Sequence, residues 1–318
     1  MQNMSITNIR EIGENINNSG DFAGTVLYDE PLLAHTTMRV GGPAAIFVEP
    51  HDVRSLSLAL RVCSGADLPY YVLGGGSNLV FGDSGFSGMV VSTACMNSMR
   101  IEGEGGSCVI RCGAGARTSA LAEFAAENGV AGFTNFAGLP GTVGGACFMN
   151  ARCYETDFSS VLLDAEYLDL EDGAIRTYSL NEKDWGYKKS PFMDSRSMII
   201  LSAGLRGKTG ARTAEELRGL NDERIRDRER RGHFKAFSAG SVFKNNRDFG
   251  KSSGAIIDEA GLKGTAVGGA QVAPWHGNFI INTGNATADD IKSLVALIQK
   301  KVRERTGFYL EPEIIFVN

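Results

Sequence analysis

Short apolar runs separated by polar turns predict a chain that mixes helices and strands. Apolar positions at helical spacing predict helices at residues 52–63, 118–129, 253–260 and 287–307. Compact apolar runs predict strands at residues 45–49, 70–73, 89–92, 108–111 and 279–282. The strand, helix, strand order over the first of these elements is typical of a small α/β unit. Residues 1–30 offer little beyond isoleucines at helical spacing, and we expect them to be peripheral.

Residues that accept hydrogen bonds from backbone amides stand where three of these helices begin. Asp52 and Thr118 are expected to cap the first two. Thr287 with Asp290 resembles a capping box, with Asp in the position usually held by Glu or Gln. Gly307 is expected to end the last helix, because glycine readily adopts the left-handed conformation found there.

Three strand-like runs follow one another closely at residues 163–170, 175–178 and 198–205. Their short polar connections favour an antiparallel sheet. Residues 213–231 mix charges of both signs and predict a solvated helix at the entry to a further domain. The whole pattern indicates an α+β layout with two lobes before that helix.

Composition narrows the class of protein. The 318 residues suggest two domains or three small ones, and 22% charged with 43% hydrophobic residues is ordinary for a globular protein. The net charge of −5 gives no indication of nucleic-acid binding. We see no signal peptide, no run of membrane-spanning length and no metal-ligand spacing among six cysteines and four histidines. A cytoplasmic protein without a bound metal is expected.

Two glycine-rich stretches, at residues 73–79 and 136–146, each follow an apolar run. Glycine permits close backbone approach, and consecutive backbone N–H groups bind anions. Together the two stretches favour one large phosphate-bearing ligand, a nucleotide or dinucleotide, while two tight turns without a ligand remain the alternative. Neither stretch has the P-loop or the Rossmann spacing.

Three further places carry reactive groups. Ser241 follows Gly240 and offers a hydroxyl that can donate a proton, although a turn serine bonded to backbone is the alternative. Glu313 stands at the edge of an apolar strand, where it either faces solvent or lies in a site. Tyr187 and Lys188 offer a phenol and an ammonium group, on a surface or against a substrate phosphate or carboxylate.

Several runs match one family in their order along the chain. They are Thr37–Ala44, Leu73–Asn78, Gly138–Ala146, Ala239–Asn245, Gly268–Val272 and Leu310–Glu313. Through these runs the chain resembles the UDP-N-acetylenolpyruvoylglucosamine reductases, flavoenzymes of bacterial peptidoglycan precursor synthesis.

The resemblance implies an α+β fold with a two-lobed FAD-binding region of the vanillyl-alcohol-oxidase (PCMH) type and a C-terminal α+β substrate-binding domain. We place the first lobe at residues 1–95, with strand 308–318 returning to it. The second lobe is placed at residues 96–210 and the substrate domain at residues 211–307.

FAD is the cofactor that the resemblance implies, and NADPH is the co-substrate. NADPH and the UDP-sugar are expected to take turns in one site of a monomeric enzyme, with no nucleic acid and no membrane insertion. The residues assigned to FAD are Arg39, Gly74, Gly75, Gly76, Ser77, Asn78, Gly138, Pro140, Gly141, Thr142, Gly144, Gly145, Ala146 and Asn150.

The implied reaction reduces the enolpyruvyl group of UDP-N-acetylglucosamine enolpyruvate to give UDP-N-acetylmuramate. Ser241 resembles the donor of the proton to C2, and Glu313 resembles the partner that stabilises the enolate or polarises the site. Lys188 is the third residue assigned to catalysis, because it stands at an active-site position of the family. The residues assigned to substrate binding are Tyr187, Lys244, Asn245 and Gln271.

Three positions depart from the family pattern. Lys188 stands where the family has arginine, so the charge is kept but the bidentate fork is lost. Arg152 stands where glycine is usual, and it either reaches FAD or a phosphate or points to solvent. Residues 231–234 lack the usual proline. We see no room between Phe158 and Leu163 for an extra tyrosine loop, which places the chain in the shorter class of the family.

Two other readings stay open. One is an oxidase or dehydrogenase on the same flavin fold, for which Cys147 is the thiol nearest the glycine stretches that could attach FAD covalently. The other is a flavin-binding or nucleotide-binding protein without catalysis, which the presence of both Ser241 and Glu313 disfavours.

Overall fold

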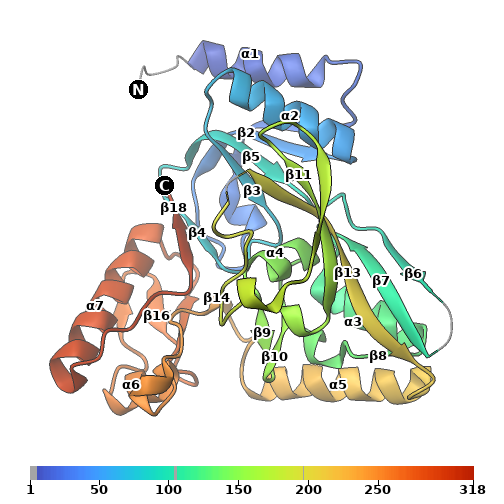
Figure 1. Cartoon of the computed structure of the whole chain (residues 1–318). Coiled ribbons are helices and arrows are strands. Elements are labelled where there is room, and N and C mark those ends of the chain that lie inside the picture. The colour runs from blue at the N-terminus through green and yellow to red at the C-terminus, as the bar shows by residue number, and fades with distance from the viewer. Residues whose placement is uncertain (1–5, 104–105, 196) are drawn as a thin grey trace. The chain divides into compact units, whose positions relative to one another are not determined.

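The computed structural model describes residues 6–103, 106–195 and 197–318. The chain forms two compact units, each made of several segments. Unit 1 contains the chain up to Tyr28 together with Ile46–Gly75 and Gly88–Arg226, and unit 2 contains Asp29–Ala45, Gly76–Ser87 and Asp227–Asn318. Figure 1 labels the elements. Both units contain helices and strands, which confirms the α+β class.

The N-terminal part of unit 1 is built on a four-stranded sheet. Its strands, in spatial order, are β1 (Gly24–Pro31), β2 (Pro43–Pro50), β5 (Phe86–Ser92) and β3 (Tyr70–Leu73). Helices α1 (Ile6–Asn17) and α2 (Val53–Gly65) pack against each other, as Figure 1 shows. The carboxylate of Asp52 accepts a hydrogen bond from Ser55 N, so the predicted cap of α2 is confirmed. Residues 1–5 lie outside the described part. For the rest of residues 1–30 the expectation of a peripheral segment is wrong, because Ile12 and Ile16 of α1 are buried in a hydrophobic core and β1 joins the sheet as its edge strand.

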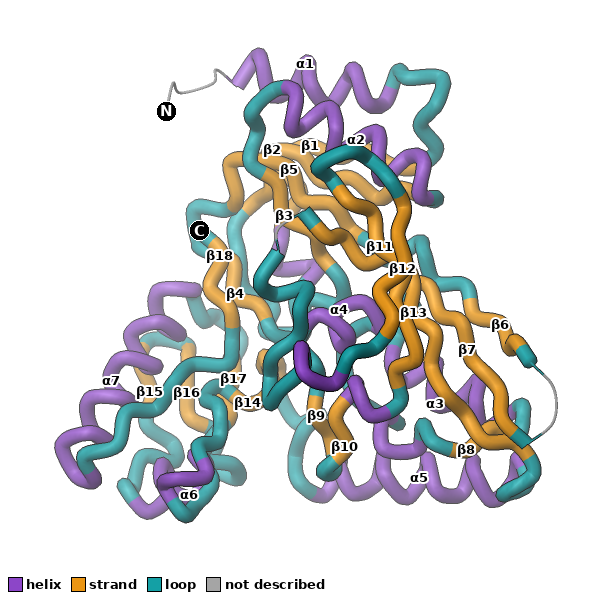
Figure 2. Tube along the Cα trace, viewed as in Figure 1, coloured by secondary structure: helices purple, strands orange, loops and turns teal. Residues whose placement is uncertain are grey.

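A six-stranded antiparallel sheet forms the rest of unit 1, and its strands lie side by side in Figure 2. The main path runs β12 (Ile175–Ser179), β11 (Leu162–Asp169), β13 (Met198–Thr209), β7 (Ser107–Gly113) and β6 (Met99–Glu102), and β8 (Val130–Ala131) pairs with β13. The predicted antiparallel arrangement of β11, β12 and β13 is confirmed. Helices α3 (Thr118–Glu127), α4 (Val143–Phe148) and α5 (Ala214–Arg230) follow in the chain, with the small hairpin β9 (Arg152–Cys153) and β10 (Thr156–Asp157) between the last two.

Thr118 does not cap α3, which corrects the prediction from its sequence. The helix begins at Thr118 itself, and the residue before it, Arg117, makes no side-chain cap. The hydroxyl of Thr118 instead donates to the carbonyl of Leu139 at 2.6 Å. The Thr118 side chain thus bonds to a residue 21 positions later, and this bond connects α3 to the second glycine stretch.

Unit 2 packs two helices around a four-stranded antiparallel sheet. The sheet order is β14 (Phe237–Ser241), β17 (Phe279–Asn282), β16 (Ala270–Val272) and β15 (Ala266–Val267). The helices are α6 (Ser253–Glu259) and α7 (Ala288–Thr306), and β18 (Ile315–Val317) pairs in parallel with β4 (Leu79–Phe81). The capping box of Thr287 and Asp290 is confirmed, and Gly307 ends α7 at φ 77° as predicted.

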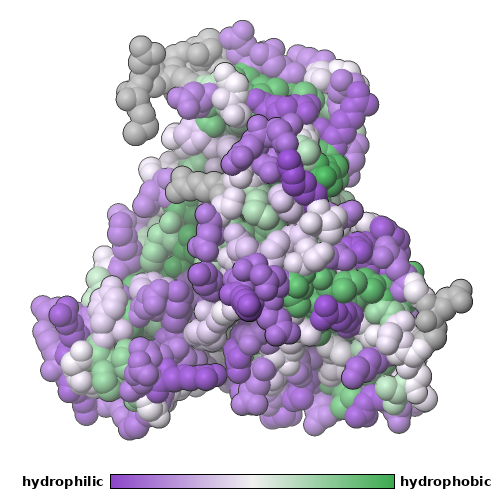
Figure 3. Space-filling model, viewed as in Figure 1, coloured by the Kyte–Doolittle hydropathy of each residue, from purple (hydrophilic) through white to green (hydrophobic). Residues whose placement is uncertain are grey.

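Within residues 6–103, 106–195 and 197–318, five short 3-10 helices complete the fold, at Leu32–His35, Thr134–Phe136, Phe158–Ser160, Glu182–Asp184 and Arg247–Phe249. In the part of the chain that is described, no helix has the length and apolar character needed to cross a membrane. On the face seen in Figure 3, hydrophilic residues cover most of the surface and smaller hydrophobic patches interrupt them. The two compact units do not test the proposed boundaries of three domains, so that division stays a prediction.

Candidate functional site

The two glycine stretches lie against each other within unit 1. A Cβ atom added to Gly75 would lie 2.6 Å from the Cα of Gly141, and one added to Gly74 would lie 2.6 Å from the hydroxyl of Thr142. No real Cβ tolerates such a distance to backbone, so this approach requires glycine. Gly75 and Gly141, which are 66 positions apart in the sequence (141 − 75), therefore contribute to one backbone-lined surface.

The amides of this surface divide into two groups. The N–H groups of Val143 and Gly144 donate to backbone carbonyls, at 2.7 and 2.8 Å. Among the residues that the structure describes, none accepts a hydrogen bond from the N–H groups of Gly74, Gly75 or Gly141. Donors left without a protein partner in a close backbone turn fit an anionic group such as the pyrophosphate of a dinucleotide.

The second stretch owes its shape to left-handed glycines around Pro140. Gly138 has φ 67° and Gly141 has φ 107°, values that other residues rarely adopt. Thr142 then caps α4 by accepting a hydrogen bond from Gly145 N at 3.3 Å. Gly145 and the buried Ala146 continue α4, so the assigned residues of this stretch occupy one turn and the helix after it.

The remaining residues of the first stretch belong to unit 2. Gly76 has φ 60°, and a Cβ there would collide with the carbonyl of His35. Ser77 leads to Asn78, whose amide donates to the carbonyl of Glu313 at 3.0 Å. A residue assigned to FAD thus holds the backbone of a residue assigned to catalysis.

Arg39, also in unit 2, takes a left-handed conformation at φ 56°. Its guanidinium carbon lies 5.7 Å from the centre of the exposed Phe237 ring, and its side chain donates to the carbonyl of Ala34 at 3.4 Å. Both contacts are compatible with a guanidinium at the surface of the unit.

Asn150, a buried residue at φ 42°, supports the turn that carries Tyr187 and Lys188. Its amide nitrogen donates to the carbonyl of Gly186 at 2.8 Å, and its amide oxygen accepts from Ser159 N at 3.0 Å. Gly186 and Lys189 close the turn with two backbone bonds of 3.1 Å. Tyr187 is 44% exposed and Lys188 has φ 54°, so both stand at the tip of a tight turn.

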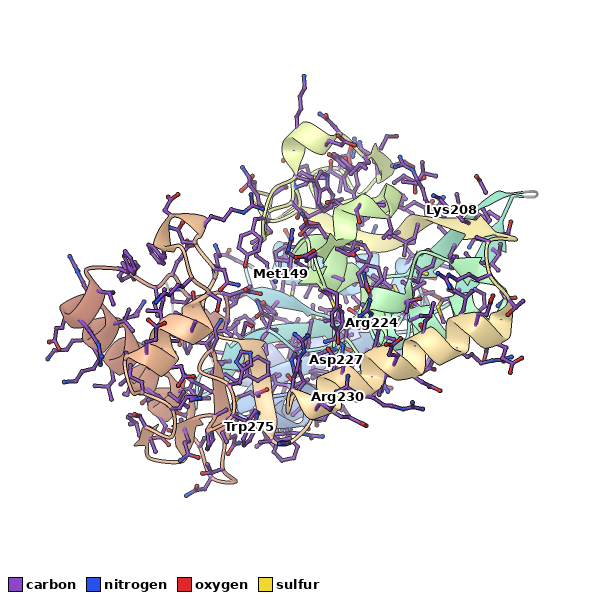
Figure 4. The ribbon with its side chains drawn as sticks, turned by 90° about the horizontal axis from the view of Figure 1, so that it is seen from below. Met149, Lys208, Arg224, Asp227, Arg230 and Trp275 are labelled. Atoms are coloured by element: carbon purple, nitrogen blue, oxygen red, sulfur yellow. The ribbon has the colours of Figure 1, made fainter. Side chains whose placement is uncertain are left out.

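Arg152, the residue that replaces a family glycine, forms an ion pair with Asp157 at 2.8 Å across the β9–β10 hairpin. At the tip of this hairpin, Tyr154 donates to the carbonyl of Arg224 at 3.2 Å and receives the Arg224 guanidinium over its ring at 4.6 Å. Arg224 lies on α5, as labelled in Figure 4. The hairpin is therefore fixed to α5, and Arg152 serves it by pairing across its strands.

In unit 2, Ser241 ends β14 at a bulge. The ladder with β17 is irregular between Ser238 and Ser241, and Gly240 takes φ 74° at this point. The next residue, Val242, donates to the carbonyl of Asn278 at 2.9 Å and accepts from Glu313 N at 2.7 Å. One backbone position thus connects the loop of Ser241 to the segment that contains Glu313.

A pocket of about 300 Å³ opens in unit 2 beside Ser241. Its lining residues are Ser241, Asn245, Ser252, Gly254, Ala255, Asp258, Lys263, Trp275, His276, Gly277 and Asn278. Two predicted residues, Ser241 and Asn245, therefore meet at one cavity. Two others lie outside its lining: Lys244 pairs with Glu311 at 2.6 Å, and Gln271 donates to the carbonyl of Gly264 at 3.1 Å.

The pocket combines a paired charge with neutral polar groups. Lys263 and Asp258 form an ion pair of 2.8 Å. Burial lowers the pKa of His276, and its Nδ1 accepts a hydrogen bond from Asn278 N at 3.2 Å, so the neutral ring carries its proton on Nε2. Trp275, labelled in Figure 4, is anchored by a bond of 3.1 Å from its indole nitrogen to the carbonyl of Gly232.

Sequence reasoning did not single out Trp275, His276, Lys263 or Asn278. The available signal was their position: three of them directly precede the apolar strand β17, whose start was predicted correctly. Residues at the end of a connecting loop are frequent members of binding sites, but a lone histidine gives no spacing to recognise. In the described part of the chain no three metal-ligating side chains gather.

Cys147, the thiol considered for covalent attachment, is fully buried in α4, and burial raises its pKa well above the usual range. A thiol held in its neutral form and away from solvent is a poor nucleophile. This disfavours a flavin bound covalently through Cys147.

Comparison with known families identifies first the general class of the protein and then its family. Residues 44–179 match the model of an FAD-binding domain, and this match covers both glycine stretches of the described surface. The chain is therefore an FAD-binding protein. Residues 232–317 match the model of the C-terminal domain of UDP-N-acetylenolpyruvoylglucosamine reductase. The chain belongs to the UDP-N-acetylenolpyruvoylglucosamine reductase family, as its motifs predicted.

Curated relatives and a solved structure support this assignment along nearly the whole chain. The UDP-N-acetylenolpyruvoylglucosamine reductase of Treponema denticola is 45% identical over 305 residues, covering 92% of this chain and 94% of the relative. That of Treponema pallidum is 37% identical and covers 90% of this chain and 92% of the relative. The crystal structure of UDP-N-acetylenolpyruvylglucosamine reductase from Thermus caldophilus is 32% identical, with a TM-score of 0.75 and coverage of 93% and 100%.

Proposed function

We propose that this chain uses NADPH to reduce the enolpyruvyl group of UDP-N-acetylglucosamine enolpyruvate, giving UDP-N-acetylmuramate for peptidoglycan synthesis. The observation that carries the proposal is the pocket of unit 2, in which Ser241 and Asn245 meet within a chain 45% identical to a reductase of this name. FAD, when bound, supplies the two-electron reducing chemistry that no side chain offers.

We assign the cofactor to the backbone surface of Gly74, Gly75, Gly141 and Thr142. These residues leave no room for a Cβ at the first two positions and present backbone N–H groups toward an anion. Within unit 1, the assigned residues Gly138, Pro140, Gly144, Gly145 and Ala146 continue the same stretch of chain. The part of the site that we assign to the pyrophosphate is therefore made of backbone N–H groups.

The chemistry at the substrate falls to side chains. Ser241 holds the proton that C2 receives, and a positioned acid of this kind contributes about 10² to 10⁴ in rate. Glu313 and Lys188 stabilise the negative charge that develops on the enolate. Tyr187, Asn245, Lys244 and Gln271 bind the substrate, and of these Asn245 lines the pocket.

The cellular setting follows from the substrates. NADPH and UDP-linked sugars are cytoplasmic metabolites, so we place the enzyme in the cytoplasm. We also propose that it acts as a monomer. Its product feeds the cell wall and so supports cell shape and division.

Anaerobic stopped-flow absorbance tests the function. NADPH is added to the FAD-loaded protein, and UDP-N-acetylglucosamine enolpyruvate follows. We expect NADPH to bleach the flavin band and the enolpyruvyl substrate to restore it. In the variant Ser241→Ala, bleaching should persist while recovery slows by about 10² or more. A wild-type protein that bleaches without recovery contradicts the assigned substrate, and a protein that cannot be loaded with FAD contradicts the cofactor assignment.

A further inference from the structure

We infer that Asn278 is a positioning residue for Ser241, and this inference rests on the proposed function. Asn278 is 4% exposed and lies at the end of the loop that enters β17. It is not among the residues that the family motifs single out. Its side chain reaches the loop that follows Ser241, and its contacts there define the role.

Both polar atoms of the Asn278 amide are used on one residue of that loop. Its Oδ1 accepts a hydrogen bond from Phe243 N at 2.9 Å, and its Nδ2 donates to Phe243 O at 2.8 Å. Phe243 is itself 1% exposed, so neither of its backbone groups has water as an alternative partner. A buried backbone group that loses its partner is costly, which makes this pair of bonds a strong constraint on the loop.

The side chain replaces a missing piece of the sheet. The regular pairing of β14 with β17 ends at Ser241 and Phe279, after the bulge at Gly240. Beyond it, Val242 N still bonds to the backbone carbonyl of Asn278 at 2.9 Å, and the amide side chain then imitates the next strand residue. An asparagine amide has one donor and one acceptor in the geometry of a peptide group, which suits this purpose.

The opposite edge of the same loop is held by backbone. Glu313 N donates to Val242 O at 2.7 Å, and Lys244 N donates to Glu311 O at 2.9 Å. The segment that follows Ser241 therefore lies between Asn278 on one side and residues 311–313 on the other. At Phe243 the Asn278 side of the loop depends on one side chain, so a single substitution removes both bonds there, whereas the backbone bonds to residues 311–313 remain.

The consequence concerns one step of the reaction. Proton donation from Ser241 to C2 requires its hydroxyl within hydrogen-bond reach of that carbon, and a displacement of about 1 Å can cost about 10²-fold in rate. Bleaching of the flavin by NADPH does not use this proton. Loss of the Asn278 clamp should therefore slow the substrate half of the cycle selectively.

The variants Asn278→Ala and Asn278→Asp test this. The first removes both bonds to Phe243, and the second keeps the size of the side chain and an acceptor while removing the donor, which excludes a simple cavity effect. Asn221→Ala is the matched control: Asn221 is also buried, at 5% exposure, and its amide donates to the carbonyl of Ala122 in unit 1. Each protein is loaded with FAD and followed by anaerobic stopped-flow, and hydrogen exchange is measured by mass spectrometry.

In both Asn278 variants we expect the recovery with enolpyruvyl substrate to slow about tenfold or more, and bleaching by NADPH to slow much less, because that step uses no proton from Ser241. Backbone exchange in residues 242–245 should accelerate. In Asn221→Ala both half-reactions and this exchange should stay as in the wild type. Equal loss of both half-reactions, or unchanged exchange at residues 242–245, overturns the inference. A wild type that never recovers overturns the proposed function instead, while the exchange comparison still decides whether Asn278 holds the loop.

Discussion

The candidate binding surfaces of the two units differ in composition: backbone atoms line the one in unit 1, and side chains line the one in unit 2. The surface in unit 1 consists of backbone, where Gly75 meets Gly141 so closely that no Cβ fits. The pocket in unit 2 consists of side chains, among them Ser241, Trp275 and His276. Backbone offers the same donors whatever the residue, and it suits a phosphate that every FAD molecule carries. Side chains can be exchanged one at a time, and they suit the part of the site that selects a substrate.

This difference predicts opposite tolerance to substitution. In unit 1 the smallest added group should displace a loop, whereas in unit 2 single changes should alter binding or rate and leave the fold. Three experiments test the contrast, and a fourth tests Lys188, a side chain of unit 1 that the resemblance assigns to catalysis.

Gly75→Ala should cost most of the FAD affinity. Its Cβ would meet the Cα of Gly141 at 2.6 Å, and relieving such overpacking costs about 1–3 kcal/mol, or about 5- to 150-fold in the dissociation constant. Titration of the apoprotein with FAD, followed by flavin fluorescence, measures it. Gly219→Ala is the control, because that glycine lies in α5 with nothing near its Cβ. Equal affinity in Gly75→Ala and wild type would remove the contrast between the units.

Trp275 should report substrate binding in unit 2. The chain has two tryptophans, so Trp185→Phe leaves Trp275 as the remaining one. Adding UDP-N-acetylglucosamine enolpyruvate to this variant should change its fluorescence, because Trp275 lines the pocket with Ser241. The complementary variant Trp275→Phe should show a smaller response. A response confined to Trp185 would contradict the assignment of substrate to this pocket.

Lys188→Arg should raise turnover modestly. Arginine restores the planar fork that binds a carboxylate with two hydrogen bonds, and we expect a gain of about fivefold, equal to ~1 kcal/mol. The left-handed backbone at Lys188 is strained to the same degree for lysine and for arginine, because both carry a Cβ. Lys189→Arg, at an exposed neighbour paired with Asp194, should leave steady-state turnover unchanged. A clear drop in the rate of Lys188→Arg would contradict the idea that lysine is the weaker substitute.

Unit 2 should also be the half that weakens in acid. Burial, with help from Arg228 and His276, lowers the pKa of His233 to about 4, and burial lowers that of His276. Both rings are neutral when folded, whereas the unfolded chain takes up protons below about pH 6.5. Their contribution to stability is therefore complete above pH 6.5 and is lost as the pH falls from 6.5 toward 4.

Thermal unfolding followed through the two single-tryptophan variants separates the units. The midpoint reported by Trp275 should fall by a few degrees between pH 7 and pH 5, and His233→Phe should reduce this fall. In the described part of unit 1 the only histidine is His51, which is exposed. The unfolding midpoint that Trp185 reports should therefore change less with pH. A midpoint in unit 2 that rises as the pH falls would reverse the sign of this argument.

The sequence was informative wherever the cause of a structure is local. Asp52 and Thr287 were identified as helix caps because a cap needs only residues within one turn. Thr118 had the same local signal, but its hydroxyl bonds to Leu139, which sequence spacing does not indicate. Strand β1 was missed because its alternation of half-buried and exposed residues gives little hydrophobic signal.

The same limit applies to the candidate site. Motifs identified Ser241 and the glycine stretches, and the FAD-binding class that they implied is confirmed by the family comparison. The assignments of individual residues stay predictions. What supports them in space was not readable from motifs: Asn150 bonds to Gly186 over 36 positions, and Asn278 bonds to Phe243 over 35. Single side chains that bind distant backbone leave no periodic pattern in a sequence.

The segmented make-up of unit 2 bears on how the protein is synthesised. Asn282 donates to the carbonyl of Met38, and β18 (Ile315–Val317) pairs with β4 (Leu79–Phe81), more than 200 residues earlier in the chain. The early segments of unit 2 therefore lack their partners until β18 has been translated, whereas every segment of unit 1 has been translated by Arg226. Unit 1, which contains Gly75 and Gly141, can therefore fold first during synthesis, and removal of β18 would affect unit 2 directly.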